Sequence, residues 1–253
     1  MLEIKNLQKV YGIPGVSAKP ALNGVDLSVG QGELVGLFGE NGAGKTTLLK
    51  CVLGLLGYAG TITLDGEPVT RANIARLSFA TCEHSFFPHL TPAGHRDFYR
   101  EHFPRWREKR FQALMDFFRL PMSKAPGSFS TGQKNQFEVI LALSQGADYI
   151  LMDEPFAGND VFNREDFYKV LLGILEPTET VVLSTHLLEE VEHFVGRAVL
   201  LRAGAVVGDT SVLELEERGM DLMAFVKSAY GYEPDRVSRA LDRLTEEGEE
   251  EAP

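Results

Sequence analysis

Residues 39–46 have the spacing of a phosphate-binding loop, G-x-x-x-x-G-K-T. They follow the apolar run 34–38, which predicts a buried strand, and precede the segment 48–53, which predicts a helix. Glycines in such a turn let backbone N–H groups face an anion, and the positive end of the helix points the same way. The lysine would reach the β- and γ-phosphates of a nucleotide, and the first threonine hydroxyl would bind Mg²⁺. The candidate ligands are Gly39, Asn41, Gly42, Gly44, Lys45, Thr46 and Thr47.

A second candidate segment lies at the end of the apolar run 149–152, where Asp153 and Glu154 follow. A strand that ends there would deliver Asp153 to Mg²⁺ and place Glu154 where it could polarise an attacking water. Taken singly, the first segment could be a glycine-rich turn that binds nothing, and the second a solvated strand end. Because both occur in one chain with the expected flanking elements, we favour a nucleotide site.

The segments around these motifs alternate between strand and helix patterns. Strand patterns cover residues 2–10, 21–29, 60–64, 77–81 and 180–184, and Asp65-Gly66 predicts a tight turn before another strand. Helix patterns run from Ser130 to about residue 144 and from about 163 to 175. This alternation predicts an α/β core with a largely parallel sheet.

Two other parts of the chain have a different character. From about residue 83 to 135, short helical patterns are separated by prolines and rich in aromatic residues, which predicts a small helical subdomain inserted into the core. Core packing is the favoured role of these aromatics over ligand binding. After Val207 the sequence is acidic and predicted to be helical, and its last dozen residues are predicted to be disordered.

Composition restricts the class of protein. The 253 residues are 44% hydrophobic and carry a net charge of −11, which fits a globular domain and disfavours nucleic acid as a partner. No apolar run approaches the roughly 18 residues of a membrane span, and no secretion signal is visible at the amino terminus. Cys51 and Cys82 lack metal-ligand partners at useful spacing, as expected for thiols in a reducing compartment. We therefore expect a cytoplasmic protein that binds no nucleic acid.

Taken together, residues 1–225 resemble the ATP-binding subunit of an ABC transporter. Besides the two motifs above, the resemblance rests on Tyr11, the segment 129–133 (FSTGQ), the segment 157–160 (AGND) and His186, all in the family's order. It implies an α/β P-loop NTPase core of ABC type, with an antiparallel β subdomain and the inserted helical subdomain at about 83–135. Residues 226–253 would form an acidic C-terminal extension.

The resemblance implies ATP and Mg²⁺ as cofactors and a role for each segment. Tyr11 would stack on the adenine ring, Thr46 and Asp153 would hold the metal, and Glu154 and His186 would be catalytic. Two ATPase subunits, identical or different, would close head to tail around two ATP molecules. The signature and interface residues of one subunit would then contact the nucleotide of the other: Ser130, Gly132, Gln133 and Asp160. Locally, an ordinary helix N-cap at Ser130 would use the same groups.

The resemblance also implies a partner, because such subunits power a separate transmembrane permease and lie on the inner face of the cell membrane through it. Phe103-Pro104-Arg105-Trp106, with a charged helix after it and Leu120-Pro121 before the signature, resembles exporter ATPases of the antibiotic-resistance kind. Two alternatives stay open. One is a soluble ABC ATPase that acts on ribosomes or DNA, which the single domain and the lack of heptads disfavour. The other is a regulatory subunit with weak turnover.

The chain departs from the family pattern at three positions. Cys82 stands where the family has glutamine, Thr131 where glycine is commoner, and Asn159 where an apolar residue is usual. A neutral thiol is a poor ligand for a hard cation, so Cys82 is not expected to inherit the role of the amide. Glu83, the next residue, offers an oxygen in its place. The other two departures bear on the strength of the closed dimer.

Overall fold

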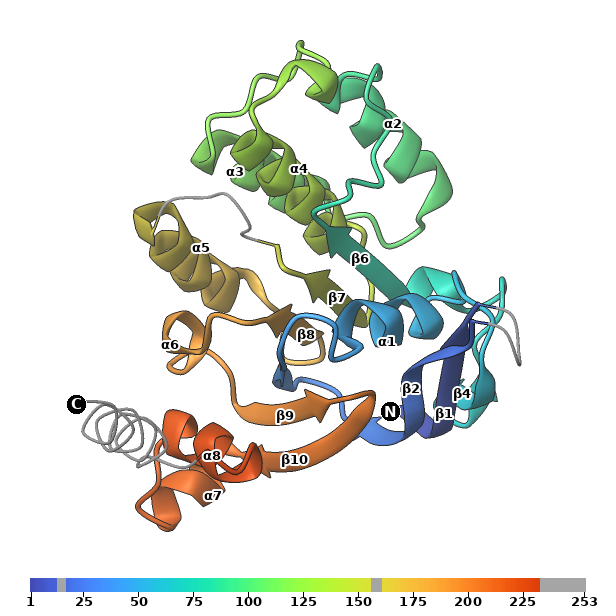
Figure 1. Cartoon of the computed structure of the whole chain (residues 1–253). Coiled ribbons are helices and arrows are strands. Elements are labelled where there is room, and N and C mark those ends of the chain that lie inside the picture. The colour runs from blue at the N-terminus through green and yellow to red at the C-terminus, as the bar shows by residue number, and fades with distance from the viewer. Residues whose placement is uncertain (13–16, 156–160, 233–253) are drawn as a thin grey trace, which may run out of the picture.

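The strand that leads into the phosphate loop, β3 (Leu34–Phe38), lies inside a six-stranded sheet (Figure 1). This computed structural model describes residues 1–12, 17–155 and 161–232, with the backbone only at 161–166 and 189–190. The strand order is β10-β9-β3-β8-β7-β6, and all neighbours are parallel except the pair β9 and β10. The bounds are Leu77–Thr81 for β6, Tyr149–Asp153 for β7, Thr180–Thr185 for β8, Arg197–Arg202 for β9 and Ala205–Ser211 for β10.

The carboxyl ends of the parallel strands meet at one edge of this sheet. Phe38 at the end of β3 pairs with Thr185 of β8, and Ser184 of β8 pairs with Asp153 of β7. The strand that ends in Asp153 is therefore separated from β3 by β8 alone. Ligands of open α/β sheets bind outside this edge, so the fold brings the two sequence motifs to one place.

Both faces of the sheet are covered, which explains the continuous apolar runs of its strands. One face packs on α1 (Lys45–Val52) and on a second, antiparallel sheet with the order β2-β1-β4-β5. The other face packs on α4 (Thr131–Ser144), α5 (Val161–Ile174) and α8 (Leu222–Ala229). Neighbouring residues of β3 alternate between the layers, since Leu37 belongs to the first cluster and Phe38 to the second.

The antiparallel sheet is built from two stretches of the chain, residues 2–29 and 59–68. Its strands are β1 (Leu2–Tyr11), β2 (Lys19–Val29), β4 (Ala59–Leu64) and the short β5 (Glu67–Pro68). Asp65 and Gly66 join β4 to β5 with positive φ angles of 52° and 84°, as predicted for a tight turn. This sheet ends beside the phosphate loop, because β1 finishes at Tyr11.

The segment between β6 and β7 is mostly helical and contains α2 (Pro92–His102), α3 (Glu108–Phe117), the 3₁₀ turn Pro126–Ser128 and α4. Its aromatic residues mainly pack inward, as predicted: Phe86, Phe111, Phe129 and Phe137 are buried. Among the described residues, no helix is long and apolar enough to cross a membrane. The domain bounds 1–225, 83–135 and 226–253 stay predictions.

Strands β9 and β10 were not predicted, and the expectation of helix after Val207 is wrong as far as Ser211. Ser211 still pairs with Arg197 of β9, and the two strands are joined by a turn at Ala203 and Gly204, both with positive φ. The helices expected there follow only afterwards, as α7 (Val212–Glu217) and α8. The Ala-Gly dipeptide between two apolar runs was the hairpin signal that sequence reasoning missed.

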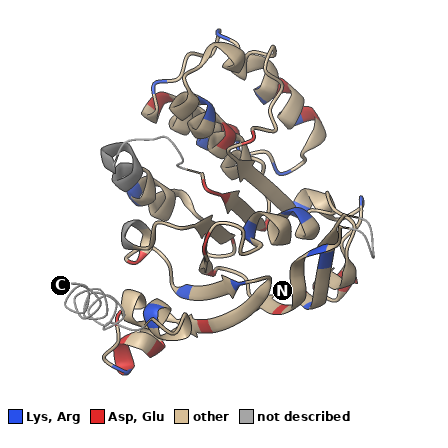
Figure 2. Cartoon of the chain, viewed as in Figure 1, with Lys and Arg blue, Asp and Glu red and all other residues tan. Residues whose placement is uncertain are grey.

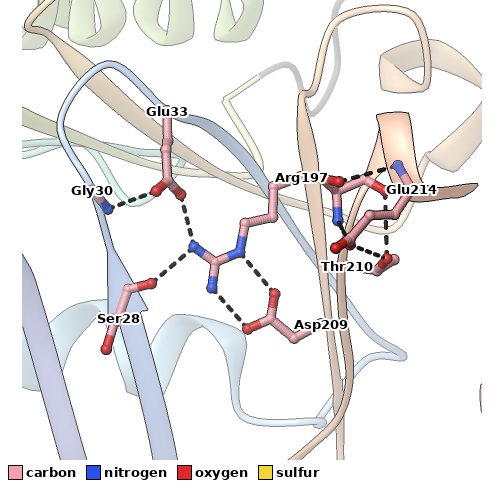
Figure 3. A network of polar contacts seen from close by, with 8 residues as sticks. Ser28, Gly30, Glu33, Arg197, Asp209, Thr210 and Glu214 are labelled. Carbon is pink, nitrogen blue, oxygen red and sulfur yellow. Dashed lines mark hydrogen bonds and ion pairs between the residues drawn. The ribbon is translucent and has the colours of Figure 1, made fainter.

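Arg197 ties this hairpin to the antiparallel sheet (Figure 3). Its guanidinium donates to both carboxylate oxygens of Asp209 in β10, at 2.7 and 2.8 Å, and to Glu33 at 2.7 Å. It also donates to the carbonyl of Ser28 in β2 at 2.9 Å. Bidentate pairs of this kind are strong and directional, so one side chain joins both sheets.

Candidate functional site

The phosphate loop lines a cavity of about 180 Å³ at the carboxyl edge of β3. Residues 40–47 form most of its wall, and Glu154 and Ala21 complete it. Gly42 and Gly44 have φ angles of +83° and +110°, which other residues rarely adopt. A Cβ at Gly44 would also lie 2.6 Å from the carbonyl oxygen of Ala21. Two of the glycines predicted from spacing, Gly42 and Gly44, are therefore required by backbone geometry.

Lys45 is held inside this loop. Its side chain is 6% exposed, and Nζ donates to the carbonyls of Gly39 at 2.6 Å and Glu40 at 3.3 Å. Burial lowers the pKa of Lys45 below its ordinary value, although the charges of Glu154 and Asp153 act in the opposite direction. A buried ammonium close to the loop is suited to contact an anion.

Asp153 at the end of β7 connects the phosphate loop with β8. It is 4% exposed and accepts hydrogen bonds from Thr46 Oγ1 at 2.7 Å and Ser184 Oγ at 2.6 Å. The first contact brings together the two residues predicted to hold a metal. Ser184 was not predicted as a site residue, and its signal would have been the pairing of β7 with β8.

Glu154 lines the cavity, and His186 lies beside it. The Nδ1 atom of His186 is 2.8 Å from Oε1 of Glu154, and Thr185 Oγ1 donates to Oε2 at 3.3 Å. Glu154 has a φ angle of +47°, and its N–H donates to the carbonyl of Ser184 at 2.9 Å. Left-handed backbone at a non-glycine residue costs about 1–3 kcal/mol and is concentrated at functional sites.

Tyr11 stands at the end of β1, next to the loop helix α1. Its side chain is 42% exposed, and its hydroxyl is 3.4 Å from Thr47 Oγ1. The ammonium of Lys9 lies over the ring, 5.1 Å from its centroid, and donates to the carbonyl of Gly57 at 2.7 Å. Sequence reasoning missed Lys9, which is two residues before Tyr11 and so on the same face of the strand.

The signature residues begin α4 but do not line the phosphate-loop cavity. Ser130 is exposed and forms a capping box with Gln133: Ser130 Oγ accepts from the N–H of Gln133 at 3.3 Å, and Gln133 Oε1 accepts from the N–H of Ser130 at 3.0 Å. Gly132 lies in the same first turn. Asp160 and the rest of the segment 157–160 lie outside the described residues.

The turn after β6 joins the helix of the phosphate loop to the signature helix. Glu83 pairs with Lys50 of α1 at 2.7 Å, and His84 Nε2 is 2.7 Å from Asn135 Oδ1 in α4. Cys82, at the start of this turn, is exposed. Partial desolvation raises the pKa of its thiol, and the neighbouring carboxylates add to that rise. That Cys82 has no metal-binding role stays a prediction, based on the poor affinity of a neutral thiol for a hard cation.

A match to the ABC transporter family covers residues 22–157, which is more than half of the chain. The chain belongs to the ABC transporter family. Its sheets, phosphate loop and flanking helices are therefore those of an ABC ATPase, the fold predicted from the motifs. The family match ends close to Glu154, so it includes the phosphate loop, the signature and β7.

Individual ABC proteins resemble the chain over most of its length. It is 33% identical over 266 residues to the Nod factor export ATP-binding protein I of Burkholderia orbicola, covering 98% of this chain and 82% of that protein. It is 32% identical over 218 residues to the sulfate/thiosulfate import ATP-binding protein of Methylococcus capsulatus, covering 81% of this chain. It spans 61% of the length of that import protein.

Solved ABC structures share the fold. A structure of the ATP-binding subunit of an ABC transporter superposes with a TM-score of 0.78 and 25% identity, covering 91% of this chain and 98% of that chain. A dimeric ATP-binding cassette in a post-hydrolysis state with ADP and Pi superposes with a TM-score of 0.73 and 23% identity, covering 83% and 98%.

Proposed function

We propose that the chain binds ATP with Mg²⁺, hydrolyses it as one half of a head-to-tail pair, and powers a separate transmembrane permease. The observation that carries the proposal is the position of Glu154. Glu154 lines the phosphate-loop cavity, and its carboxylate contacts His186 at 2.8 Å. A base in that position can take the proton of a water that attacks the terminal phosphate.

ATP would be held at both of its ends. The N–H groups of the phosphate loop and the Lys45 ammonium suit the phosphates. The Tyr11 ring suits the adenine, because it is partly exposed at the strand end beside the loop and every base has a face for stacking. These groups belong to one chain, so ATP binding does not require a partner.

Thr46 and Asp153 fit a Mg²⁺ ion. Their oxygens are 2.7 Å apart, and neighbouring ligands of octahedral Mg²⁺ at 2.0–2.1 Å would be about 2.9 Å apart. Within the described residues, no group of three or more His, Cys, Asp or Glu side chains could hold a metal. That agrees with an ion whose remaining ligands are phosphates and water. A bound Mg²⁺ neutralises charge on the phosphates.

His186 would hold the base and the γ-phosphate in line. One ring nitrogen contacts Glu154, and the ring is about half exposed, so the other nitrogen would be accessible to a phosphate oxygen. Thr185 donates to the second carboxylate oxygen and limits rotation of the same group. Glu154 is therefore oriented from both sides, which is what a general base needs.

A second subunit would complete each site. Ser130, Gly132 and Gln133 begin a helix whose N–H groups suit a γ-phosphate, yet they lie outside the wall of their own chain's cavity. A head-to-tail partner would bring them to the nucleotide, together with Asp160. A related cassette described as dimeric supports this arrangement. The partner could be an identical or a different ATPase subunit.

The permease would be a separate membrane protein, and export is the direction we favour. The Nod factor export relative matches 98% of the chain, against 81% for the import relative. Phe87 is 51% exposed on the turn that precedes α2 and is a candidate contact for the permease. The ATPase would then lie in the cytoplasm at the inner face of the cell membrane. Acidic and basic residues are interspersed over the described elements (Figure 2), so we propose no nucleic-acid partner.

A regulatory ABC subunit with weak turnover is the second candidate. Cys82 favours it, since this residue follows Thr81, which pairs with Asp153 at the edge where the nucleotide would bind. A glutamine expected there from the family pattern is missing. The intact pair of Glu154 and His186 favours the active ATPase.

Steady-state hydrolysis by Glu154→Gln tests the proposal. This change keeps the shape and removes the basic group, so turnover should fall by about 10²–10⁴-fold while ATP binding persists. Because hydrolysis would reopen the pair, the variant should elute as a dimer when ATP is present. Glu67→Gln, on the exposed strand β5, is the matched control and should hydrolyse ATP normally. Near-normal turnover of Glu154→Gln, with only monomer in gel filtration, would refute the assignment.

A further inference from the structure

Arg110 of α3 joins the carboxyl ends of two long helices to the start of β8. Its Nη1 donates to the carbonyl of Leu143 in α4 at 2.9 Å, and its Nη2 donates to the carbonyl of Ile174, the last residue of α5, at 2.6 Å. The same two nitrogens donate to both carboxylate oxygens of Glu179, each at 2.8 Å. Glu179 precedes β8 and also accepts the N–H of Glu176 at 2.8 Å.

This cluster is enclosed. The side chain of Arg110 is 9% exposed and that of Glu179 is 4% exposed. A cation at the carboxyl end of a helix is favourable because the carbonyls there carry partial negative charge, and here one guanidinium serves two such ends. Its planar fork is also matched to the carboxylate. A lysine would keep the charge but could not make this set of contacts.

The other end of α4 carries the signature. Ser130 caps the start of α4, and Arg110 bonds the helix near its end, at Leu143. The 14 residues of α4 therefore connect the two contacts, and a change of helix angle at one end displaces the other. Such a helix is about 21 Å long, and a rotation of about 10° at one end would displace the other by about 3–4 Å. That displacement exceeds the length of a hydrogen bond.

Hydrogen bonds to β6 and to the turn after it hold α4 on a different side from Arg110's contacts with α5 and β8. Gln145 donates to the carbonyl of Leu77 in β6 at 2.8 Å, and Glu138 accepts from Ser85 in the turn after β6. These contacts attach α4 to β6, whereas Arg110 attaches it to α5 and β8. Arg110 therefore adds a directional attachment on the α5 side of a helix that is otherwise held by apolar packing and by its contacts on the β6 side.

We infer that Arg110 is a positioning residue for ATP hydrolysis: it fixes the angle of α4 to the core and so the place of Ser130 and Gln133 at the far end of that helix. The functional half of this inference rests on the proposed function, because Ser130 and Gln133 would act on the nucleotide of a second subunit. The structural half concerns the single chain.

Arg107 provides a matched control. It is the residue that precedes α3, one turn before Arg110, and it also forms a bidentate pair, with Glu176 at 2.5 and 2.7 Å. That pair is partly exposed, at 35% and 45%. Among the described residues, the Arg107 guanidinium bonds Glu176 and no carbonyl of α4 or α5. Only its backbone N–H reaches α4, at the carbonyl of Ser144, and a change of side chain keeps that bond. The variants Arg110→Lys and Arg107→Lys therefore differ in the helix contacts that they remove.

Distances between spin labels test the structural half without ATP or a partner. Labels at Ser128→Cys, just before α4, and Glu67→Cys, in β5, are placed in a Cys82→Ser background, where Cys51 is buried. Arg110→Lys should shift or broaden the distance by about 3 Å or more, and Arg107→Lys should match the parent. Unchanged distances in Arg110→Lys, or equal changes in both variants, would overturn the inference.

Steady-state kinetics test the functional half in the unlabelled protein. Arg110→Lys should lower kcat at least about fivefold while KM for ATP changes less than about twofold, since the chain's own phosphate loop is untouched. If Arg110→Lys fails to fold, Glu179→Gln takes its place in both measurements: it weakens the link of Arg110 to β8 but keeps the two bonds to helix carbonyls, so smaller changes in the same direction are expected. An altered distance with normal kcat would reject the role in hydrolysis. If kcat falls in Arg110→Lys but not in Glu154→Gln, the assignment of Glu154 as the base is wrong, and the positioning role of Arg110 is retained.

Discussion

Thr46 Oγ1 donates a 2.7 Å hydrogen bond to Asp153 Oδ2, although the two residues are 107 positions apart in the chain. Thr46 lies in the first turn of α1, and Asp153 is the last residue of β7. The contact exists because β3 and β7 end at the same edge of the sheet with β8 between them. Two oxygens from distant segments are thereby placed as neighbouring ligands for one cation.

Thr46→Val should reduce the effect of Mg²⁺ on ATP binding. Valine has a similar shape but no oxygen, and a contact to a charged group contributes about 1.5–3 kcal/mol. That corresponds to roughly a 10- to 150-fold loss of affinity. ATP titrations in excess Mg²⁺ and in excess chelator measure the effect, and the loss should appear only with Mg²⁺ present.

Thr61→Val is the control for this change, because Thr61 is exposed in β4. It should bind ATP like the unmodified chain in both conditions. Should Thr46→Val lose affinity equally with and without Mg²⁺, the hydroxyl would be serving the loop itself and the metal role would be rejected.

The local parts of the site were predictable from sequence because each depends on neighbours in the chain. The spacing of the phosphate loop and the apolar run before Asp153 are of this kind. Ser184 was missed because its contact with Asp153 depends on the pairing of two strands about 30 residues apart. The hydrogen bonds of Arg110 were missed for the same reason, since they depend on where two helices end. Strand order and helix angles are decided by packing, which periodicity does not encode.

Tyr11→Ala should weaken ATP binding by roughly 5- to 150-fold, since stacking of a base on an aromatic ring contributes about 1–3 kcal/mol. Titration with a fluorescent ATP analogue gives the affinity. Tyr58→Ala is the control, because Tyr58 is similarly exposed, at 37%, whereas it is the Tyr11 hydroxyl that lies 3.4 Å from Thr47 of the phosphate-loop segment. If Tyr11→Ala binds ATP as tightly as Tyr58→Ala does, Tyr11 serves packing and not the nucleotide.

His95 should make the folded protein less stable in mild acid. The ring is fully buried, Nδ1 is 3.0 Å from the carbonyl of Thr91, and Nε2 accepts the N–H of Phe87 at 3.0 Å. Burial lowers the pKa of His95 below 6.5. As pH falls through 6.5, His95 binds a proton in the unfolded chain but stays neutral in the folded chain, because its pKa there is lower. The free energy of unfolding therefore falls, by at most about 1.4 kcal/mol per pH unit for one group.

Urea unfolding at pH 7.5 and 5.5 isolates this effect when it is repeated with His95→Gln. The variant should be less stable at both pH values, because it repacks a buried site, yet it should lose less stability between them. Other titrating groups contribute equally to both proteins and cancel in the difference. The same loss in the two proteins would show that His95 is not the group responsible.

Substitutions at Cys82 and Glu83 test whether the turn after β6 supplies an oxygen ligand to the nucleotide site or only connects α1 with α4. If Glu83 supplied the oxygen that Cys82 lacks, Glu83→Gln would lower turnover by about tenfold or more, equal to about 1.4 kcal/mol of barrier. The carboxylate of Glu83 instead pairs with Lys50 at 2.7 Å and is 65% exposed. Exposed pairs contribute about 0–1 kcal/mol, so we expect a loss below about fivefold.

Cys82→Ala should change turnover less than about threefold, because its neutral thiol is a poor partner for a hard cation. Steady-state hydrolysis by the two variants, with Glu101→Gln at an exposed position of α2 as the control, decides between the hypotheses. A tenfold loss in Glu83→Gln alone would restore the oxygen-donor role. A large loss in Cys82→Ala would assign the thiol a function that neither its exposure nor its neighbours suggest. Small changes in both variants would mean that the turn only connects the phosphate loop with the signature helix. It does so through Glu83, which pairs with Lys50 of α1, and His84, which contacts Asn135 of α4.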